Sequence, residues 1–352
     1  MTVRIILIGY GVVGQSLTSM LLRRRQETVK DYGFNPKIVA IVDRGGAAIN
    51  AKGLDLENML KLKKQKHTVA ADSKFGFSDM TPLEVIASTE AEVVVEATST
   101  NVENGEPGLS HIKTAFKTGK HVVTTNKGPL ALAFPALTEL ADYNKVFLRF
   151  SGTVGGGTPV LELAKKCLSG DRILAVRGIL NGTTNYILTE MAEKSITFDQ
   201  ALESAQKLGY AETDPSMDID GIDPACKVVI IANWIMNRKI TLRDVNVQGI
   251  RGVTLEALKK ADQRGNTIKL LGSIDGEPRV TPTEISRHDP LCVGGVLNAV
   301  TFVSEFAGEE TIIGKGAGGP ETASAVLRDL LDIRHSLADR QLEQLGFGGW
   351  KK

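Results

Sequence analysis

The residues best suited to chemistry lie between Gly209 and Lys227, where acids crowd together and a single lysine closes the run. Within 12 residues the segment carries five carboxylates, which are Glu212, Asp214, Asp218, Asp220 and Asp223. Like charges at this density repel one another unless they are solvated or a cation neutralises them. The pattern therefore predicts a solvated loop or one that receives a positively charged ligand.

The end of this run has the geometry of an acid–base pair. Asp223-Pro224 is typical of a helix start, with Asp223 as the N-cap and Pro224 in the first helical position. Lys227 follows one turn later on the same face, where the helix dipole disfavours its charge and Asp223 favours it. A lysine under opposed influences can act as a general acid or base. A surface cap with an i,i+4 ion pair is the plainer alternative.

The apolar run Val228–Met236 follows at once and predicts a buried helix that anchors the loop. A calcium loop is excluded by spacing. With Asp218 and Asp220 as ligands and Gly221 at the turn, Lys227 falls where a bidentate glutamate is required.

Composition limits the class of protein. The 352 residues carry a net charge of +1 and are 42% hydrophobic, which argues against a nucleic-acid binder. Three cysteines (Cys167, Cys226, Cys292) lack metal-ligand spacing, and an odd number suits a reducing compartment. The N-terminus has no signal-peptide pattern and no run reaches membrane-spanning length. We expect a soluble, cytoplasmic protein with neither a membrane nor a nucleic-acid partner.

The N-terminal half predicts a dinucleotide-binding domain over residues 1–150. The strand Val3–Ile8 runs into Gly9-Tyr-Gly11-Val-Val-Gly14, and residues 13–31 have the pattern of an amphipathic helix. In this setting the glycines allow a tight turn, backbone approach to a pyrophosphate and close helix packing, and the helix N-terminus supplies N–H groups. The expected contacts are Gly9, Gly11, Val12, Val13 and Gly14.

Further strands extend this pattern into an α/β fold with a parallel sheet. Lys37–Val42 ends in Asp43-Arg44, where the acid suits the ribose of NAD and the arginine suits the phosphate of NADP, so both cofactors stay open. We expect the nearby lysines to form a solvated helix face rather than a phosphate clamp; they are Lys61, Lys63, Lys64 and Lys66.

Two more strand ends should reach the same crevice. Strand Ala91–Ala97 is followed by Thr98 and Ser99, and strand His121–Thr125 by Lys127 before a Gly-Pro turn. The remaining elements expected in this half are the helices Pro107–Thr118 and Ala133–Tyr143 and the strand Val146–Phe150.

The second half predicts an α+β domain over residues 151–313 for the substrate and for dimerisation, because strands after residue 265 could pair between two copies. It opens on the glycine-rich hinge Ser151–Thr158. The expected elements are the helix Pro159–Leu168, the strand Ile173–Ile179, a helix after Leu180–Asn185, and the strands Gln248–Ile250, Thr267–Ile274, Arg279–Ser286 and Ala299–Glu305. Residues 314–335, a glycine-rich turn and a helix to about Ile333, should complete the first domain, with 336–352 as a tail.

Taken in order, the motifs resemble the homoserine dehydrogenase family from residue 3 to about residue 333. They are G-Y-G-x-x-G, T-N-K-G-P-L-A, V-G-G-G-T-P, L-N-G-T-T-N, G-Y-A-E-x-D-P, D-G-x-D-x-x-x-K and G-x-G-A-G-x-x-x-T. The resemblance implies reversible, NAD- or NADP-dependent interconversion of L-homoserine and L-aspartate 4-semialdehyde, on the route to threonine, methionine and isoleucine. It implies Lys227 as proton donor and acceptor, Asp223 as its orienter and Lys127 near nicotinamide and substrate. The implied amino-acid pocket is Glu212, Asp218, Thr183 and Tyr210, with Gly318 at the cofactor.

The chain departs from the family pattern in two ways. Many members carry a glutamate in place of Ser151, at a proposed monovalent-cation site beside Val154, Gly156 and Thr158, so we do not expect sodium or another metal here. From the length of the sequence we also expect neither an aspartokinase module nor an ACT domain after residue 335.

Two alternatives compete with this interpretation. A semialdehyde dehydrogenase would need an activated cysteine after a glycine-rich turn, and none of the three cysteines has that setting. A non-catalytic dinucleotide sensor would keep the fold but would not need Asp223 and Lys227 together.

Overall fold

The computed structural model describes residues 1–344, which fall into two compact units. Unit 1 comprises residues 1–129 and 136–153 and the described residues from Thr322 onward. Unit 2 comprises residues 130–135 and 154–321. The predicted fold class is confirmed, because one unit is built on a largely parallel sheet covered by helices and the other is α+β.

Unit 1 contains a seven-stranded sheet in the order β4-β3-β2-β1-β5-β6-β7. The five strands from β2 to β7 in this order are parallel, and β3 and β4 are antiparallel additions at one edge. The central strands consist almost entirely of buried Val, Ile, Leu and Ala, as expected of a sheet covered on both faces. The bounds are β1 Thr2–Ile8, β2 Asn35–Asp43, β3 Gly46–Ile49, β4 Gly76–Phe77, β5 Val93–Glu96, β6 His121–Thr124 and β7 Leu148–Arg149.

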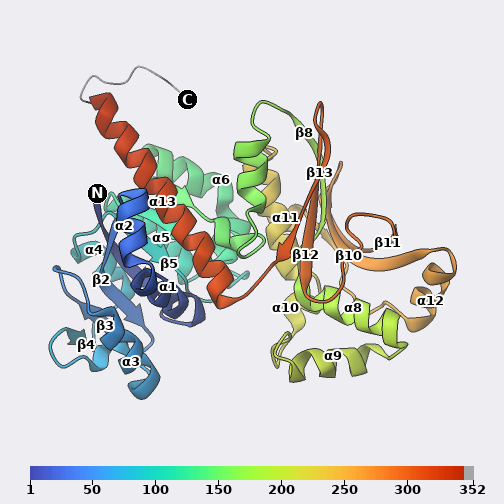
Figure 1. The fold of residues 1–352 in the computed structure, drawn as a ribbon, viewed down its shortest axis with the longest axis horizontal. Helices are drawn as coiled ribbons and strands as arrows, with labels where there is room; N and C mark the ends of the chain where they lie inside the picture. The colour runs from blue at the N-terminus through green and yellow to red at the C-terminus, as the bar shows by residue number, and fades with distance from the viewer. Residues whose placement is uncertain (345–352) are drawn as a thin grey trace. The chain divides into compact units, whose positions relative to one another are not determined.

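Strand β1 lies between β2 and β5, so the order of the strands reverses there. In sheets of this kind, ligands bind at the carboxyl ends of the strands beside such a reversal. The helices of this unit are α1 Val12–Arg23, α2 Arg25–Tyr32, α3 Leu56–Lys66, α4 Pro82–Ser88, α5 Gly108–Lys117 and α13 Gly319–Gln344, with 3-10 turns η1 Val69–Ala71 and η2 Ser151–Thr153. Helix α6, Lys127–Tyr143, belongs partly to each unit. The long helix α13, red in Figure 1, adds Ala323, Val326 and Leu330 to the same hydrophobic core as β1 and α1.

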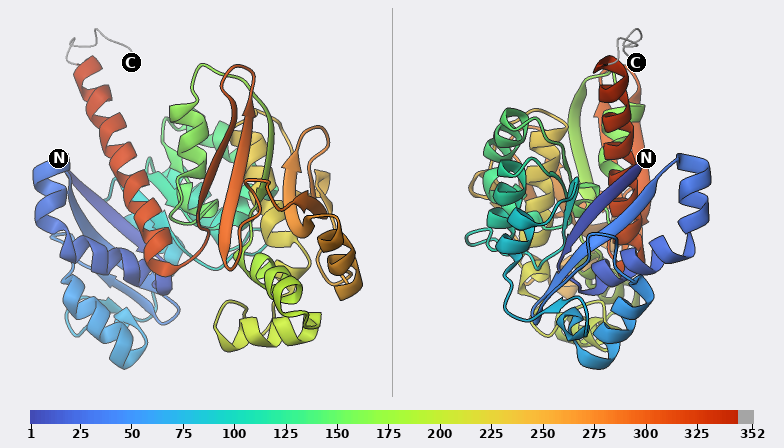
Figure 2. Two further views of the ribbon diagram at one scale, coloured as in Figure 1. Left: turned by 45° about the vertical axis from the view of Figure 1, so that its right-hand side comes forward. Right: turned by 90° about the vertical axis from the view of Figure 1, so that its left-hand side faces the viewer.

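Unit 2 contains a six-stranded sheet in the order β13-β12-β8-β10-β11-β9. Four central strands are antiparallel neighbours, and β12 and β13 form the long hairpin drawn in orange and red in Figure 2. The bounds are β8 Ile173–Ile179, β9 Asn246–Val247, β10 Asn266–Ile274, β11 Arg279–Ser286, β12 Leu297–Ser304 and β13 Gly308–Lys315. The helices are α7 Val160–Glu162, the π-turn η3 Leu163–Cys167, α8 Gly182–Lys194, α9 Phe198–Lys207, α10 Ser216–Ile219, α11 Ile222–Trp234, the 3-10 turn η4 Leu242–Asp244 and α12 Leu255–Gln263.

Most predicted elements are confirmed within a few residues, and the exceptions have local causes. The helix expected over 13–31 breaks at Arg24 into α1 and α2, of which α2 is polar and buries only Thr28. Helix α6 begins at Lys127 instead of Ala133, where the backbone kinks ahead of Pro135. The strand expected at Gln248–Ile250 is wrong, since β9 ends at Val247. Strand β13 was not predicted, because its solvent-exposed GEETIIGK sequence lacks a hydrophobic pattern.

The N-cap prediction for Asp223 is also wrong. Helix α11 begins at Ile222, and its N-cap is Gly221 with φ of 85°. Glycine adopts this left-handed conformation at little cost, which lets the chain turn sharply from α10 into α11. Asp223 thus lies inside the first turn, where its carboxylate is available to other groups.

The expected tail, residues 336–352, falls partly outside the described residues. Its first part continues α13 as far as Gln344.

Candidate active site

A buried lysine and two carboxylates form one cluster in unit 2, where β8 leads into α8 and α10 leads into α11 (labelled in Figure 1). The Lys227 ammonium donates hydrogen bonds to the Leu180 carbonyl oxygen at 2.5 Å and to Asp223 Oδ2 at 2.7 Å. Both partners of the ion pair are buried, with side-chain exposures of 8% for Lys227 and 12% for Asp223. An ammonium has three N–H donors, so one remains for a further acceptor. The plainer alternative of a surface ion pair is therefore wrong.

Asn181 holds this cluster together. It is the N-cap of α8, and its Oδ1 accepts a hydrogen bond from Thr184 N at 2.9 Å. Its Nδ2 donates to Asp218 Oδ1 at 2.6 Å and to Asp223 Oδ2 at 2.8 Å. Sequence reasoning placed Asn181 in a motif but not in the site. An asparagine N-cap directly after a strand, on a polar segment, was the signal that could have found it.

The Asp218 carboxylate is held in an unfavourable environment. Burial raises its pKa above the usual range, and the negative charge of Asp223 adds to the effect. The hydrogen bond from Asn181 and the charge of Lys227 act in the opposite direction. A ligand cation beside Asp218 would relieve the repulsion between the two acids.

The other three acids of the run are not part of this cluster. Asp220 forms an ion pair with Arg251, Nε to Oδ1, at 2.5 Å, and Asp214 accepts from Ser216 N at 3.1 Å at the start of α10. Glu212 is exposed, and its carboxylate has no hydrogen bond or ion pair among residues 1–344. The run thus divides into two acids that stabilise local structure, two in the cluster and one facing solvent.

Two further predicted residues lie beside the cluster. The Thr183 hydroxyl, in the first turn of α8, donates to the Tyr210 carbonyl oxygen at 2.8 Å. The Tyr210 ring packs edge-on against Tyr186 with centroids 5.0 Å apart and is 44% exposed. These contacts fix the loop that carries the acids to helix α8.

The glycine turn of unit 1 fits a dinucleotide. Gly9 has φ of 94°, and a Cβ there would lie 2.5 Å from the Ala97 carbonyl oxygen. A Cβ on Gly14 would lie 2.5 Å from the Gly9 carbonyl oxygen, whereas one on Gly11 would meet nothing within 4 Å. The turn therefore packs closely against neighbouring backbone at Gly9 and Gly14, and it leaves open space beside Gly11. Val12 and Val13 begin α1, whose N-terminus has no side-chain cap in the described structure, so their N–H groups suit a pyrophosphate.

The carboxylate of Asp43, at the end of β2, already accepts hydrogen bonds at both of its oxygens. Its carboxylate accepts from four donors, which are Lys63 Nζ at 2.7 Å, Thr68 Oγ1 at 2.8 Å, Gly45 N at 2.9 Å and Val69 N at 3.1 Å. Its side chain is 4% exposed, whereas Arg44 next to it is exposed. The expectation of a solvated lysine face is correct for Lys61, Lys64 and Lys66 but wrong for Lys63.

The ends of β5 and β6 are tied together by Asn126. Its Nδ2 donates to Thr98 Oγ1 and to the Ser99 carbonyl oxygen, both at 3.2 Å, and its Oδ1 caps α6. Thr98 Oγ1 in turn donates to the buried Glu96. Lys127 is the half-buried first residue of α6 rather than part of a loop. The structure thus brings Thr98, Ser99 and Lys127 to adjacent strand ends, with Asn126 as the residue that sequence reasoning missed.

Two other predictions concern the glycine-rich segments. Gly318 has φ of 130°, and a Cβ there would lie 2.2 Å from a carboxylate oxygen of Glu321. Ser151 is buried, and its N–H donates to Asp329 Oδ2 at 2.8 Å. Among residues 1–344 no group of three or more His, Cys, Asp or Glu is placed to hold a metal.

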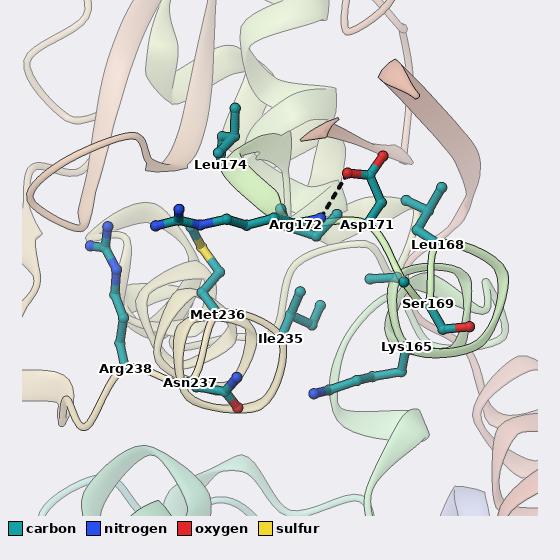
Figure 3. A pocket seen from close by; sticks show the side chains of 13 residues that line it. Lys165, Leu168, Ser169, Asp171, Arg172, Leu174, Ile235, Met236, Asn237 and Arg238 are labelled. Atoms are coloured by element: carbon teal, nitrogen blue, oxygen red, sulfur yellow. Dashed lines mark hydrogen bonds between the residues drawn. The ribbon is translucent and has the colours of Figure 1, made fainter. Parts of the chain in front are cut away.

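A separate cavity of about 580 Å³ in unit 2 lies between η3, the start of β8 and the end of α11 (Figure 3). Lys165, Arg172 and Arg238 line it, and Figure 3 shows the two guanidinium groups on one side, with the Asp171 carboxylate on the other. Asp171 accepts from the backbone N–H groups of Arg172 and Ala307 at 2.7 and 2.8 Å. No predicted site residue is among the described residues that line this cavity, so it is separate from the cluster around Lys227.

The described residues include no helix long and apolar enough to span a membrane.

Comparisons with known proteins agree over most of the chain. Residues 9–151 match the family model described as homoserine dehydrogenase, NAD binding domain, and residues 159–331 match that of homoserine dehydrogenase. The homoserine dehydrogenase of Methanocaldococcus jannaschii is 45% identical over 94% of this chain and 98% of its own. The NAD(+)-dependent homoserine dehydrogenase of Pseudomonas canavaninivorans is 40% identical, with coverages of 96% and 98%.

Solved structures agree as well. A protein of Archaeoglobus fulgidus, described as a candidate homoserine dehydrogenase, is 39% identical with a TM-score of 0.86, covering 94% of this chain and 99% of its own. A hyperthermophilic archaeal homoserine dehydrogenase in complex with NADPH is 29% identical with a TM-score of 0.83, covering 96% and 98%.

Proposed function

Because the chain belongs to the homoserine dehydrogenase family, we propose that Asp218, Asp223 and Lys227 form the site where it binds and converts its substrate. The protein is an NAD(P)-dependent oxidoreductase that interconverts L-homoserine and L-aspartate 4-semialdehyde. The alternative of a non-catalytic dinucleotide sensor is not favoured by these comparisons.

The substrate carries an ammonium group, and Asp218 is proposed to receive it, with Glu212 and Tyr210 at the outer side. The support is electrostatic. Burial and the negative charge of Asp223 raise the pKa of Asp218. A cation bound beside Asp218 would relieve the repulsion between the two carboxylates, and this favours its binding. Asn181 fixes the direction of the Asp218 carboxylate through its 2.6 Å hydrogen bond.

Lys227 is proposed to move the proton. Its third N–H would donate to the aldehyde oxygen during reduction, and the neutral amine would accept the hydroxyl proton during oxidation. Asp223 and the Leu180 carbonyl orient the ammonium and stabilise its charge. The bound nicotinamide cofactor supplies or accepts the hydride. The observation that carries the proposal is a buried lysine whose two fixed hydrogen bonds leave one donor for substrate.

A comparison of two substrates tests the ammonium site. L-Homoserine and 4-hydroxybutanoate share the alcohol, but the second lacks the amino group. We expect wild-type kcat/KM to favour homoserine by about 10- to 100-fold, the size of a charged hydrogen bond. Asp218→Asn should lose most of that preference while retaining turnover of 4-hydroxybutanoate. Full preference in the variant would place the ammonium elsewhere.

We also propose a homodimer. Strand β13 is an edge strand of eight residues, and edge strands offer unpaired backbone groups for pairing. Phe306 just before it and Ile313 within it are 83% and 49% exposed. Light scattering of the purified protein coupled to size exclusion measures the mass directly. A single-chain mass of 37.8 kDa would reject the dimer.

The proposed location is the cytoplasm, where NAD(P) and amino-acid intermediates are supplied and where an odd number of cysteines is tolerated. Fractionation of the source cells, with the enzyme detected by its activity, tests this.

A further inference from the structure

Lys269 is a buried lysine that the reaction does not use. It lies in β10 of unit 2 with a residue exposure of 4%. Its ammonium donates three hydrogen bonds, to Asn185 Oδ1 at 2.8 Å, to Thr189 Oγ1 at 2.9 Å and to the Val293 carbonyl oxygen at 2.9 Å. All three N–H donors are used and all three acceptors are uncharged. Lys269 therefore has no carboxylate partner among its hydrogen bonds in the described structure.

These acceptors belong to helix α8 and to the segment between β11 and β12. Asn185 and Thr189 lie on successive turns of α8, and Val293 lies in the segment between β11 and β12. Asn185 Nδ2 donates to the carbonyl oxygens of Val293 and Leu297 at 3.2 and 3.0 Å, so its carboxamide is fully committed. Lys269 thus closes a network that joins a strand, a helix and a loop.

The same helix carries the proposed substrate site at its N-terminus. Asn185 lies one turn after Asn181, and its N–H donates to the Asn181 carbonyl oxygen at 3.3 Å. Gly182 packs so tightly on this loop that a Cβ would lie 2.6 Å from the Val296 carbonyl oxygen. A change in the position of Asn185 would therefore move Asn181, and with it the hydrogen bonds to Asp218 and Asp223.

We propose that Lys269 is a positioning residue for this enzyme: its ammonium fixes the first turns of α8 against the segment 291–297, and so sets the position of Asn181 in the substrate site. The inference rests on the function proposed above for the cluster around Asn181. It adds an acid–base group that never touches substrate but controls the geometry in which substrate is bound.

The ionisation of Lys269 makes the anchor dependent on pH. Burial lowers its pKa from 10.5 to about 8. Cys292 in the loop and Glu193 on α8 act to raise the pKa, and Arg287 after β11 acts to lower it. Helix α12, which also packs on β10, buries Leu258 and Ala261. A neutral amine has two N–H donors instead of three, so above about pH 8 one acceptor loses its donor.

The test removes one acceptor without touching the lysine. Thr189→Val keeps the shape of the side chain but leaves the third N–H of Lys269 without an acceptor, which disfavours the charged form. We expect wild-type kcat/KM for homoserine to fall above pH 8, mainly through KM, and Thr189→Val to shift this fall about one pH unit lower. Thr189→Ser, which keeps the hydroxyl, should restore the wild-type profile. The ionisation of the substrate itself cannot produce a shift that depends on the variant.

Lysine-selective ¹³C NMR separates the possible outcomes. The Lys269 signal is assigned by its loss in Lys269→Met, and its titration is then followed in wild type and Thr189→Val. If Thr189→Val lowers both the pH at which Lys269 titrates and the pH at which kcat/KM falls, the proposal is supported. If the titration midpoint of Lys269 falls while the pH profile of kcat/KM stays unchanged, the proposal is overturned. It is also overturned if Thr189→Val leaves the titration midpoint of Lys269 unchanged. Failure of the proposed substrate site would appear separately, as an unchanged homoserine preference in Asp218→Asn.

Discussion

Two aspartate–lysine pairs in this molecule share nearly the same local pattern. In unit 1 Lys63 Nζ lies 2.7 Å from Asp43 and 2.7 Å from the His67 carbonyl oxygen. In unit 2 Lys227 Nζ lies 2.7 Å from Asp223 and 2.5 Å from the Leu180 carbonyl oxygen. Each lysine thus has one carboxylate and one backbone carbonyl as acceptors. By distance and donor count alone, neither pair would be singled out as catalytic.

The surroundings separate the two pairs. Both Asp43 oxygens are saturated by uncharged donors besides Lys63, with no second acid nearby in the network. Asp223 instead shares the Asn181 amide with a second carboxylate, Asp218, whose pKa is raised. An ion pair whose charges are balanced stabilises the fold, whereas one beside an unbalanced charge is ready to bind a cation. The electrostatic surroundings, rather than the pair itself, are the reason for proposing Lys227 and not Lys63 as the catalytic lysine.

Removal of each lysine should reveal the largest difference between the two pairs. Lys227→Ala should lower kcat for homoserine oxidation by roughly 10²- to 10⁴-fold, the usual contribution of a positioned acid–base group. Cofactor affinity, measured by fluorescence titration, should change little. Lys63→Ala is the matched control and should keep kcat within a few-fold. Near-normal turnover in Lys227→Ala, or equal losses in both variants, would show that the two pairs do not differ as argued.

Some residues of these two regions can be predicted from the sequence, and others cannot. The glycine turn, the strand ends and Lys227 can be found from order and spacing, because a parallel sheet places consecutive strand ends at one edge. The roles of Asn181 and Asn126 could not be found in this way. Each is a helix cap whose second amide group binds a side chain or carbonyl distant in sequence, and such pairing depends on tertiary structure.

The sequence likewise could not predict which acids of the run between Glu212 and Asp223 are paired after folding. Asp220 is neutralised by Arg251, which lies 31 residues further along the chain. Burial distinguishes Asp218 from Glu212, although both were assigned to the same pocket. Local spacing gives the density of charge but not which charges remain unbalanced after folding.

The saturation of Asp43 in unit 1 also predicts a cofactor preference. Since Asp43 is committed to four donors, we expect exposed Arg44 to meet the 2′-phosphate of NADP. Arg44→Ala should lower kcat/KM for NADP by about 10-fold and leave that for NAD nearly unchanged. Steady-state assays with both cofactors at saturating homoserine measure the ratio. A variant that loses both equally would mean that Arg44 supports the fold rather than the phosphate.

The raised pKa of Asp218 also predicts a pH dependence that Asp43 should not produce. If Asp218 receives the substrate ammonium as proposed, it must be ionised, and KM for homoserine should rise as pH falls through this raised pKa, by at most tenfold per pH unit. Asp218→Asn should show a higher KM that no longer depends on pH in this range. A rise in KM that persists in the variant would assign the titration to another group.

The smallest expected effect is on stability, and here the two acids should differ in sign. The pKa of Asp218 is raised in the folded state, so its contribution to stability is present below the unfolded value and is lost as pH rises through the folded one. At pH 7 the ionised carboxylate therefore destabilises the folded protein, and Asp218→Asn should raise Tm by about 2 °C. Asp43→Asn should lower Tm by a similar amount, because Lys63 and three other donors lose their charged acceptor. Differential scanning fluorimetry at pH 7 measures both. Shifts of the same sign would mean that Asp218 is a structural acid like Asp43, and the substrate site would have to be sought around Glu212 instead.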